Sequence, residues 1–144
     1  MTTCYRNALL FPLLLLTSIA IGQAERTFVK SFNLQGRQTV ILNLGDNIQV
    51  NRWDNDLMRV QMTDSTPSMN NAMLKSVAES GRYMLKNEMT APVFIVTVPA
   101  TEKGMKINGN DVKEIITYTV FVPKNVTILK NTDPNSKIVA KMNP

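Results

Sequence analysis

Histidine is absent from the chain, and cysteine occurs once, as Cys4, among 144 residues. The remaining residues therefore offer no imidazole or thiol for a disulfide framework, a zinc site, a Cys–His pair or a Ser–His–Asp triad. Glycines beyond the N-terminal segment stand alone, and neither a glycine-rich phosphate loop nor a G-x-S-x-G motif is present. These absences predict a protein that is not an enzyme, with no catalytic residues, no cofactor and no metal.

Long apolar runs are limited to one, from Ala8 to Ile21. This run is shorter than the roughly 20 residues that a membrane-spanning helix needs. A basic residue precedes it, and Gly22 and Ala24 occupy the −3 and −1 positions of a cut after Ala24. The arrangement predicts a secretory signal peptide over residues 1–24 and a single β-rich domain over 25–144 without a membrane span. A membrane anchor is the alternative interpretation.

The position of the cysteine bears on the compartment. Cys4 lies ahead of the apolar run, so it would leave with the signal peptide and cannot act as a lipoprotein cysteine, which follows such a run. An exported chain without cysteine is typical of bacterial envelope proteins rather than of small disulfide-built modules. We therefore expect an exported protein, either periplasmic or extracellular at the cell surface.

Positive charge is in modest excess, since 16 basic and 11 acidic residues give a formal net charge of +5. The basic residues are scattered, and aromatic residues make up only 6% of the chain. Nucleic-acid binding uses a basic stripe, often with aromatic side chains that stack on bases. The sequence therefore predicts no nucleic-acid partner and a mildly basic surface.

Alternation of apolar and polar residues dominates residues 27–63 and predicts half-buried strands over 27–33, 39–44, 47–53 and 57–63. Clusters of Asn, Asp and Gly separate these segments and are typical of turns. Further strands are expected over 82–86, 93–98, 105–107, 115–122, 126–129 and 137–140, with a tight turn at Asn108–Asp111. The residues predicted to face the core are Phe28, Phe32, Val40, Leu42, Ile48, Val50, Val60, Ile95, Tyr118, Val120 and Val122.

In one segment the spacing of apolar residues changes from the period of a strand to that of a helix, which predicts a short helix over residues 69–80. Its helically spaced residues are Met69, Ala72, Met73, Val77 and Ser80. Ser68 or Asn70 can cap its start, and Gly81 suits its exit. Packing onto a sheet is the favoured role of its methionines, and a binding face is the alternative. The whole pattern predicts an all-β fold with this one helix, built as a short β-solenoid or a two-sheet sandwich.

Several segments resemble a known family. NIQVNRWDNDLMRVQMT, SGRYMLK, FIVTVPA and VKEIITYTVFVPKNVTI are similar to bacterial exported adhesin-type β-rich domains of unknown function, associated with head-domain adhesins and β-strand repeats. Trp53 with Asn55, and the segment from Val120 to Ile128, occupy the places of the family's W-x-x-(N/D) turn and V-x-V-P segment. The resemblance implies an all-β fold, often a right-handed β-helix, with no catalytic residues and no defined ligand. Unlike longer relatives, the chain ends about 20 residues after its V-P segment.

Three residues around one turn are the candidate ligand-binding site. Trp53 is the single tryptophan and follows Gln49 and Asn51 on the polar face of its strand, where it could stack on a sugar ring. Asp54 and Asp56 flank Asn55 in the turn. A calcium loop needs further oxygen ligands at set spacing, so we predict no metal. A tryptophan that packs over a sheet edge and a solvated turn are the alternative interpretations.

The sequence thus favours a non-catalytic binding module of the envelope or cell surface, adhesin-like in class. Its expected partner is a glycan or an unknown envelope protein. The alternative is an envelope structural or accessory protein that acts through protein–protein contacts. An enzyme would need an Asp or Glu pair inside a pocket, for example around Asp54, Asp56 or Glu114.

Overall fold

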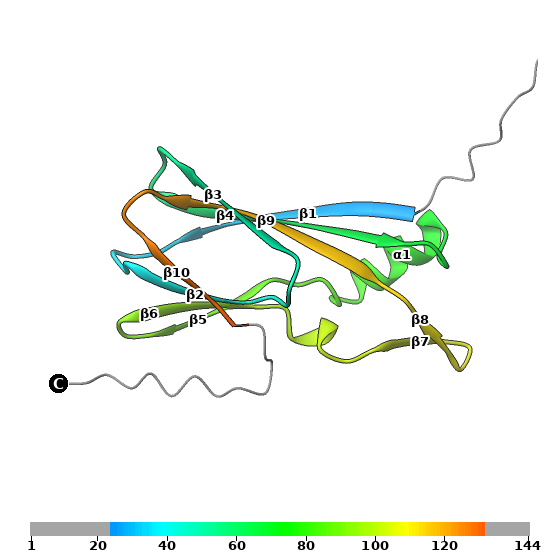
Figure 1. The fold of residues 1–144 in the computed structure, drawn as a ribbon. Coiled ribbons are helices and arrows are strands. Elements are labelled where there is room, and N and C mark those ends of the chain that lie inside the picture. The colour runs from blue at the N-terminus through cyan, green and yellow to red at the C-terminus, as the bar shows by residue number, and fades with distance from the viewer. Residues whose placement is uncertain (1–23, 132–144) are drawn as a thin grey trace, which may run out of the picture.

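Two four-stranded β-sheets lie face to face in the computed structural model of the chain, which describes residues 24–131 (Figure 1). Sheet A contains, in spatial order, β1 (Ala24–Asn33), β4 (Leu57–Thr66), β9 (Ile115–Pro123) and β3 (Ile48–Trp53). Sheet B contains β10 (Thr127–Lys130), β2 (Thr39–Asn43), β6 (Val93–Thr97) and β5 (Lys86–Thr90). The smaller elements are helix α1 (Asn71–Glu79), the 3₁₀ turn η1 (Pro99–Thr101) and the hairpin of β7 (Met105–Ile107) and β8 (Asn110–Val112).

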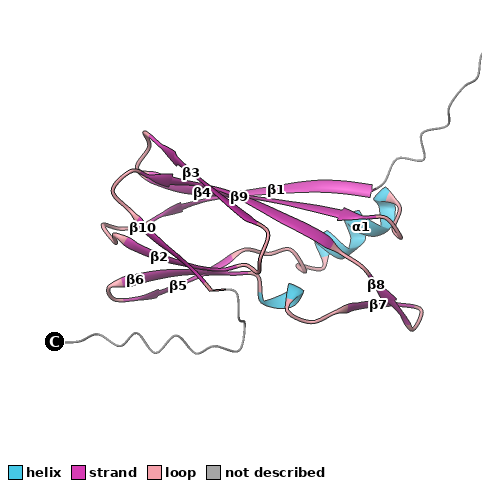
Figure 2. Cartoon of the chain, viewed as in Figure 1, coloured by secondary structure: helices cyan, strands magenta, loops and turns pink. Residues whose placement is uncertain are grey.

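The strand pairing distinguishes between the two architectures that the sequence leaves open. In sheet A, β4 runs antiparallel to both of its neighbours, β1 and β9, and β3 runs parallel to β9. In sheet B, β10, β2 and β6 are parallel, and β5 returns antiparallel to β6. A solenoid stacks successive parallel rungs, whereas here the chain crosses repeatedly between two mixed sheets. The protein is therefore an all-β two-sheet sandwich with one α-helix (Figure 2).

Most of the predicted core faces are confirmed. Val40 and Leu42 of β2 and Met58, Val60 and Met62 of β4 are fully buried between the sheets. Ile95 is a wrong prediction. It pairs with Ile41 on the outer face of sheet B, while Phe94 and Val96 fill the core. Because residues 93–98 are apolar on both faces, alternation within β6 does not reveal the inner one; the register with β2 decides it.

Helix α1 covers the inner face of sheet A beyond the reach of sheet B and packs against β1 (Figure 1). The Asn70 side chain caps its first turn and accepts a hydrogen bond from the Met73 amide at 2.9 Å. Gly81 leaves the helix with φ of +87°. The Asn70 cap and the Gly81 exit are confirmed, but the helix spans 71–79 instead of 69–80, so Met69 lies before it. Leu74 is the buried residue of the helix, whereas Ala72 and Ser80, which were expected on the apolar face, are exposed.

The prediction of a strand over residues 82–86 is wrong, because Arg82 and Tyr83 form a turn and β5 starts only at Lys86. Tyr83 and Leu85 are both buried, so this stretch is held by its side chains rather than by a ladder. The hairpin turn at Asn108 and Gly109 is confirmed, with φ of 52° and 83°. The predicted strand 137–140 lies outside the described residues.

Basic side chains close both open flanks of the sandwich without an acidic partner. On one flank, Lys30 of β1 donates to the Leu85 carbonyl at 2.7 Å, just before β5. On the other, Lys130 of β10 donates to the Ile48 carbonyl of β3 at 2.9 Å. Arg52 of β3 donates to the Pro123 carbonyl at 3.1 Å and to the Val126 carbonyl. Lys30 and Lys130 thus reach from one sheet to backbone at the other. Arg52 ties the end of β9, in its own sheet, to the loop that leads to β10.

We expect Arg52→Met to lower the free energy of unfolding by about 1–3 kcal/mol, because two backbone carbonyls lose a charged donor. Lys124→Met is the matched control. It removes an exposed ion pair with Asp54, so it should cost less than about 0.5 kcal/mol. Urea denaturation of both variants measures the difference. Equal effects of the two substitutions would contradict the bridging role of Arg52.

Candidate functional site

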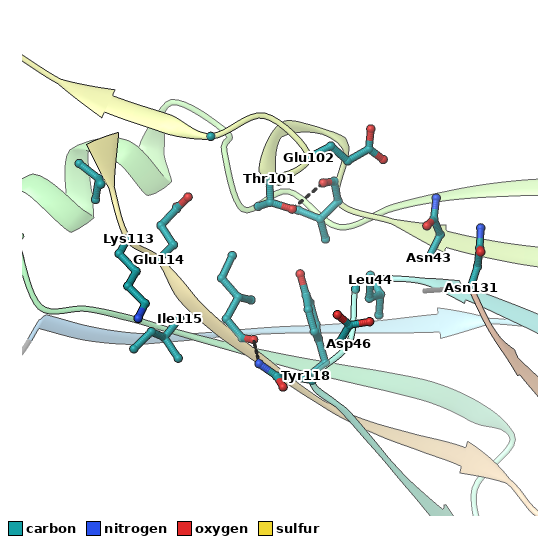
Figure 3. Close-up of a pocket in the computed structure, with 16 residues that line it drawn as sticks. Asn43, Leu44, Asp46, Thr101, Glu102, Lys113, Glu114, Ile115, Tyr118 and Asn131 are labelled. Carbon is teal, nitrogen blue, oxygen red and sulfur yellow. Dashed lines mark hydrogen bonds between the residues drawn. The ribbon is translucent and has the colours of Figure 1, made fainter. Parts of the chain in front are cut away.

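Sheet A extends past sheet B at one end of the sandwich (Figure 1). A cleft of about 730 Å³ opens at this end (Figure 3). The loop after β2, the segment around η1 and the first part of β9 form its walls. Its polar lining includes Asn43, Asp46, Asn47, Thr101, Glu102, Lys113, Glu114, Tyr118 and Asn131. Its apolar lining includes Leu44, Val98, Val112, Ile115 and Ile116. The size and mixed lining are those of a ligand-binding cleft.

The loop after β2 takes its shape from a turn at Gly45 and Asp46. Gly45 has φ of +87°, a conformation that glycine adopts without steric cost. The Ile48 amide then donates to the Asp46 carbonyl at 3.0 Å, and the Asn47 carbonyl accepts from the Tyr118 amide at 2.8 Å. Figure 3 shows Asp46 beside the Tyr118 side chain as a result.

An ion pair between Arg82 and Glu114 holds the far wall of the cleft. The Arg82 guanidinium donates to both carboxylate oxygens of Glu114, from Nε at 2.8 Å and from Nη2 at 2.5 Å. The same guanidinium donates to the carbonyls of Ala100 and Lys103, each at 2.8 Å. The Arg82 and Glu114 side chains are only 13% and 10% exposed. This bidentate, largely buried pair fixes the segment around η1 against the start of β9.

The ion pair continues into the core through Tyr83. The Tyr83 hydroxyl donates to Glu114 Oε1 at 2.8 Å, and it also hydrogen-bonds to Asp64. Asp64 and Thr66 are fully buried at the end of β4, and the Thr66 hydroxyl lies 3.1 Å from both Asp64 oxygens. Arg82, Glu114, Tyr83, Asp64 and Thr66 therefore form one chain of polar contacts, which we call the polar network.

Burial shifts the proton affinities in the polar network. Desolvation raises the pKa of Asp64 above its ordinary value near 3.8, and hydrogen bonds from Tyr83 and Thr66 oppose the rise. Burial, followed by hydrogen bonding to Glu114 and Asp64, raises the pKa of Tyr83, which stays neutral. The Tyr83 hydroxyl has one proton and lies between two carboxyl groups, those of Glu114 and Asp64. The network thus links a buried carboxyl group with a raised pKa in the core to an ion-paired carboxylate at the cleft.

Tyr118 lies deeper in the cleft and contributes an aromatic wall. Its side chain is buried, and burial raises the pKa of its hydroxyl to about 12. The hydroxyl is hydrogen-bonded to Thr101, whose own hydroxyl donates to the Val98 carbonyl at 2.8 Å. Figure 3 shows the tyrosine directed toward Thr101, with Asn43 and Asn131 at the far end of the cleft. Arg82 and Tyr83 both donate to Glu114, so the carboxylate oxygens of Glu114 are occupied by contacts within the protein.

The predicted site residues Trp53, Asp54 and Asp56 lie elsewhere, at the end of β3. The structure brings them together with Lys124 and Asn125 around a concave surface of about 610 Å³. Asp54 is paired with the Lys124 ammonium at 2.6 Å, and both groups are exposed. The shared concavity is compatible with the predicted site, and its ligand remains a prediction.

Trp53 itself makes several contacts within the protein. Its indole nitrogen donates to the Leu57 carbonyl at 2.9 Å. The Arg59 guanidinium lies 4.8 Å from the ring centroid, and the Phe121 ring lies 5.4 Å away, both on the outer face of sheet A. These contacts favour the interpretation that Trp53 packs on the sheet over the interpretation that its ring is open for stacking on a sugar.

Sequence reasoning missed the polar network, although one signal was present. Met58, Val60 and Met62 alternate toward the core, and the same period places Asp64 and Thr66 on that face. A carboxyl group that continues an apolar face predicts a buried polar site. The partners of Asp64 gave no such signal, because Tyr83 and Glu114 belong to segments distant in sequence.

Comparisons with known proteins identify no family. No family model and no curated protein matches the chain. Among solved structures, the chain is similar to a putative cell adhesion protein from Clostridium sporogenes, with a TM-score of 0.38 and 11% sequence identity. The match covers 74% of this chain and 45% of that protein. Within residues 24–131, no group of three or more acidic side chains could hold a metal, and no helix is long and apolar enough to cross a membrane.

We expect Asp64→Asn to change how stability depends on pH. Because the folded-state pKa of Asp64 is raised, its protonated form stabilises the fold at low pH, and this contribution is lost as pH rises through that pKa. The asparagine amide mimics the protonated acid, so the variant should gain stability relative to wild type from about pH 4 upward. Urea denaturation between pH 3 and pH 8 measures this. A constant difference between the two proteins at every pH would contradict a raised pKa of Asp64 in the folded state.

Proposed function

We propose that this protein is a non-catalytic, exported binding module of the bacterial envelope or cell surface, adhesin-like in class, and that the cleft beside Tyr118 holds its ligand. The observation that carries the proposal is the combination of an open cleft with a rigid wall. Side-chain amides, hydroxyls and carboxylates line the cleft, while the Arg82–Glu114 pair fixes the segments that carry them. Groups that are already positioned before binding lose less entropy when a ligand arrives.

The chemistry of the lining supports recognition over catalysis. The Glu114 carboxylate accepts hydrogen bonds from Arg82 and Tyr83, so its oxygens are committed to the wall. Asp64 is fully buried beneath it and has no access to a bound substrate. General acid–base catalysis needs a carboxyl group in contact with the reacting atoms. Asp46 and Glu102 are exposed at the rim, where they suit contacts to hydroxyl or cationic groups of a ligand.

A structural or accessory protein of the envelope is the second candidate. Met84 and Met89 are 56% and 47% exposed, and they flank the start and end of β5, an edge strand of sheet B. Exposed methionines beside an open edge suit a protein contact. The region around α1 is less suited to a protein contact than the edge at β5, because Met69 is buried and Met73 packs against the core.

We expect the double variant Asp46→Asn/Glu102→Gln to weaken ligand capture about ten-fold while the fold is kept, because both changes keep side-chain size and remove charge at the cleft rim. The assay applies the purified chain to a glycan array and, in parallel, to envelope extract. Glu79→Gln is the matched control, since it removes an exposed charge from α1, away from the cleft.

Each variant has a distinct meaning in this assay. Loss of capture in the cleft variant alone supports the proposal. Capture that persists in the cleft variant but disappears in Trp53→Ala would move the ligand to the turn at Trp53, Asp54 and Asp56. If capture is lost only in the variants Met84→Ser and Met89→Ser, the result would favour the accessory protein. A wild-type chain that captures neither a glycan nor an envelope protein would contradict a binding function.

A further inference from the structure

The edge of sheet A contains a gap that opens into the cleft. β9 begins at Ile115, but its neighbour β3 begins only at Ile48, which is in register with Tyr118. The first residues of β9 therefore pair with β4 on one side and have no β3 residue on the other. The cleft runs along this part of β9, since Lys113 to Ile116 line it.

The backbone of Ile116 faces this gap. The Tyr118 amide donates toward β3, to the Asn47 carbonyl, so alternate residues of β9 direct their backbone groups to that side. Ile116 is two residues earlier and has the same direction. Within residues 24–131, the Ile116 carbonyl accepts a hydrogen bond on this side only from the Asn47 side-chain amide, at 3.5 Å, and the Ile116 N–H donates to no backbone carbonyl of β3. The Asn47 side chain thus makes a weak contact with Ile116 at the place where a longer β3 would pair with β9.

The turn at Gly45 is the cause of the gap. The left-handed conformation of Gly45 and the bond from the Ile48 amide to the Asp46 carbonyl direct the chain away from β9 before β3 starts. Space for another extended segment remains between this loop and the segment around η1. Leu44 and Val98 form an apolar floor there, and the exposed carboxylates of Asp46 and Glu102 stand at the rim.

We propose that an extended segment of a partner protein adds to sheet A at this gap and pairs with Ile116. This inference rests on the proposed binding function and gives its ligand a chemical class. The segment accepts a hydrogen bond from the Ile116 N–H and donates one to the Ile116 carbonyl, in place of the Asn47 amide. Alternate side chains of an added strand point to opposite faces, so an apolar one enters the floor at Leu44 and Val98.

Charge complementarity selects among such segments. The chain as a whole carries a net charge of +5, yet Asp46 and Glu102 make this rim acidic. Lys113 lies at the opposite end of the cleft in Figure 3. We therefore expect a segment with a basic residue toward Asp46 and Glu102. Backbone pairing supplies affinity, and the apolar and basic side chains supply specificity.

The test uses the full chain and a random heptapeptide library displayed on phage. Peptides selected on wild type are measured against Ile116→Pro and Ile116→Val. Proline removes the N–H that faces the gap without removing a bond to β4, because Ile116 and Asp64 form a non-hydrogen-bonded pair. Valine keeps that N–H. We expect at least a ten-fold loss of peptide affinity in Ile116→Pro and less than a three-fold change in Ile116→Val.

A second measurement does not depend on the proline variant folding. Addition of a selected peptide to the wild-type chain should slow hydrogen exchange of the Ile116 amide at least ten-fold. Peptides that bind without protecting that amide would overturn strand addition. Failure to select any peptide, while a glycan or an envelope protein is still captured through Asp46 and Glu102, would also overturn it and leave the binding function standing. Failure of all three probes would contradict the binding function as well.

Discussion

The Arg82–Glu114 ion pair is the constraint on which the functional end of the sandwich depends. Arg82 follows the helix, Glu114 precedes β9, and the guanidinium also holds the carbonyls of Ala100 and Lys103. One side chain thus joins the segment after the helix to the segment around η1 and to the residue before β9. Since both partners are largely buried, removal of either leaves an uncompensated charge in a poorly solvated place. The cleft keeps its shape because this cost opposes any separation of its walls.

The rest of the fold is stabilised differently at each flank and end. Along the flanks, Lys30 and Lys130 reach from one sheet to backbone carbonyls at the other, and Arg52 holds the carbonyls of Pro123 and Val126 on either side of the β9–β10 turn. At the cleft, the polar network combines the Arg82–Glu114 ion pair with the buried carboxyl group of Asp64, whose pKa is raised by desolvation. Buried polar groups of this kind stabilise only when every member has a partner. The network holds the neighbouring walls of the cleft in place. The proposed recognition of a glycan or peptide depends on groups that are positioned before the ligand binds.

Local sequence patterns predicted much of the fold and little of the site. Alternation in β2 and β4, the Asn70 cap and the Asn108–Gly109 turn were sufficient because each depends on neighbouring residues. β6 was misjudged at Ile95 because apolar residues occupy both of its faces. The polar network and the gap beside Ile116 arise from contacts between distant segments and from the register of β3 against β9. No period within a single segment encodes these features.

Hydrogen exchange of Arg82→Met beside wild type tests most directly whether the ion pair fixes the cleft. The account predicts faster exchange of backbone amides in the segments that Arg82 joins, over residues 99–107 and 114–118. Amides at the centre of sheet B, in β2 and β6, should keep their wild-type rates under native conditions. Unchanged rates around the cleft, or the same acceleration in both regions, would contradict a local role for the Arg82–Glu114 pair.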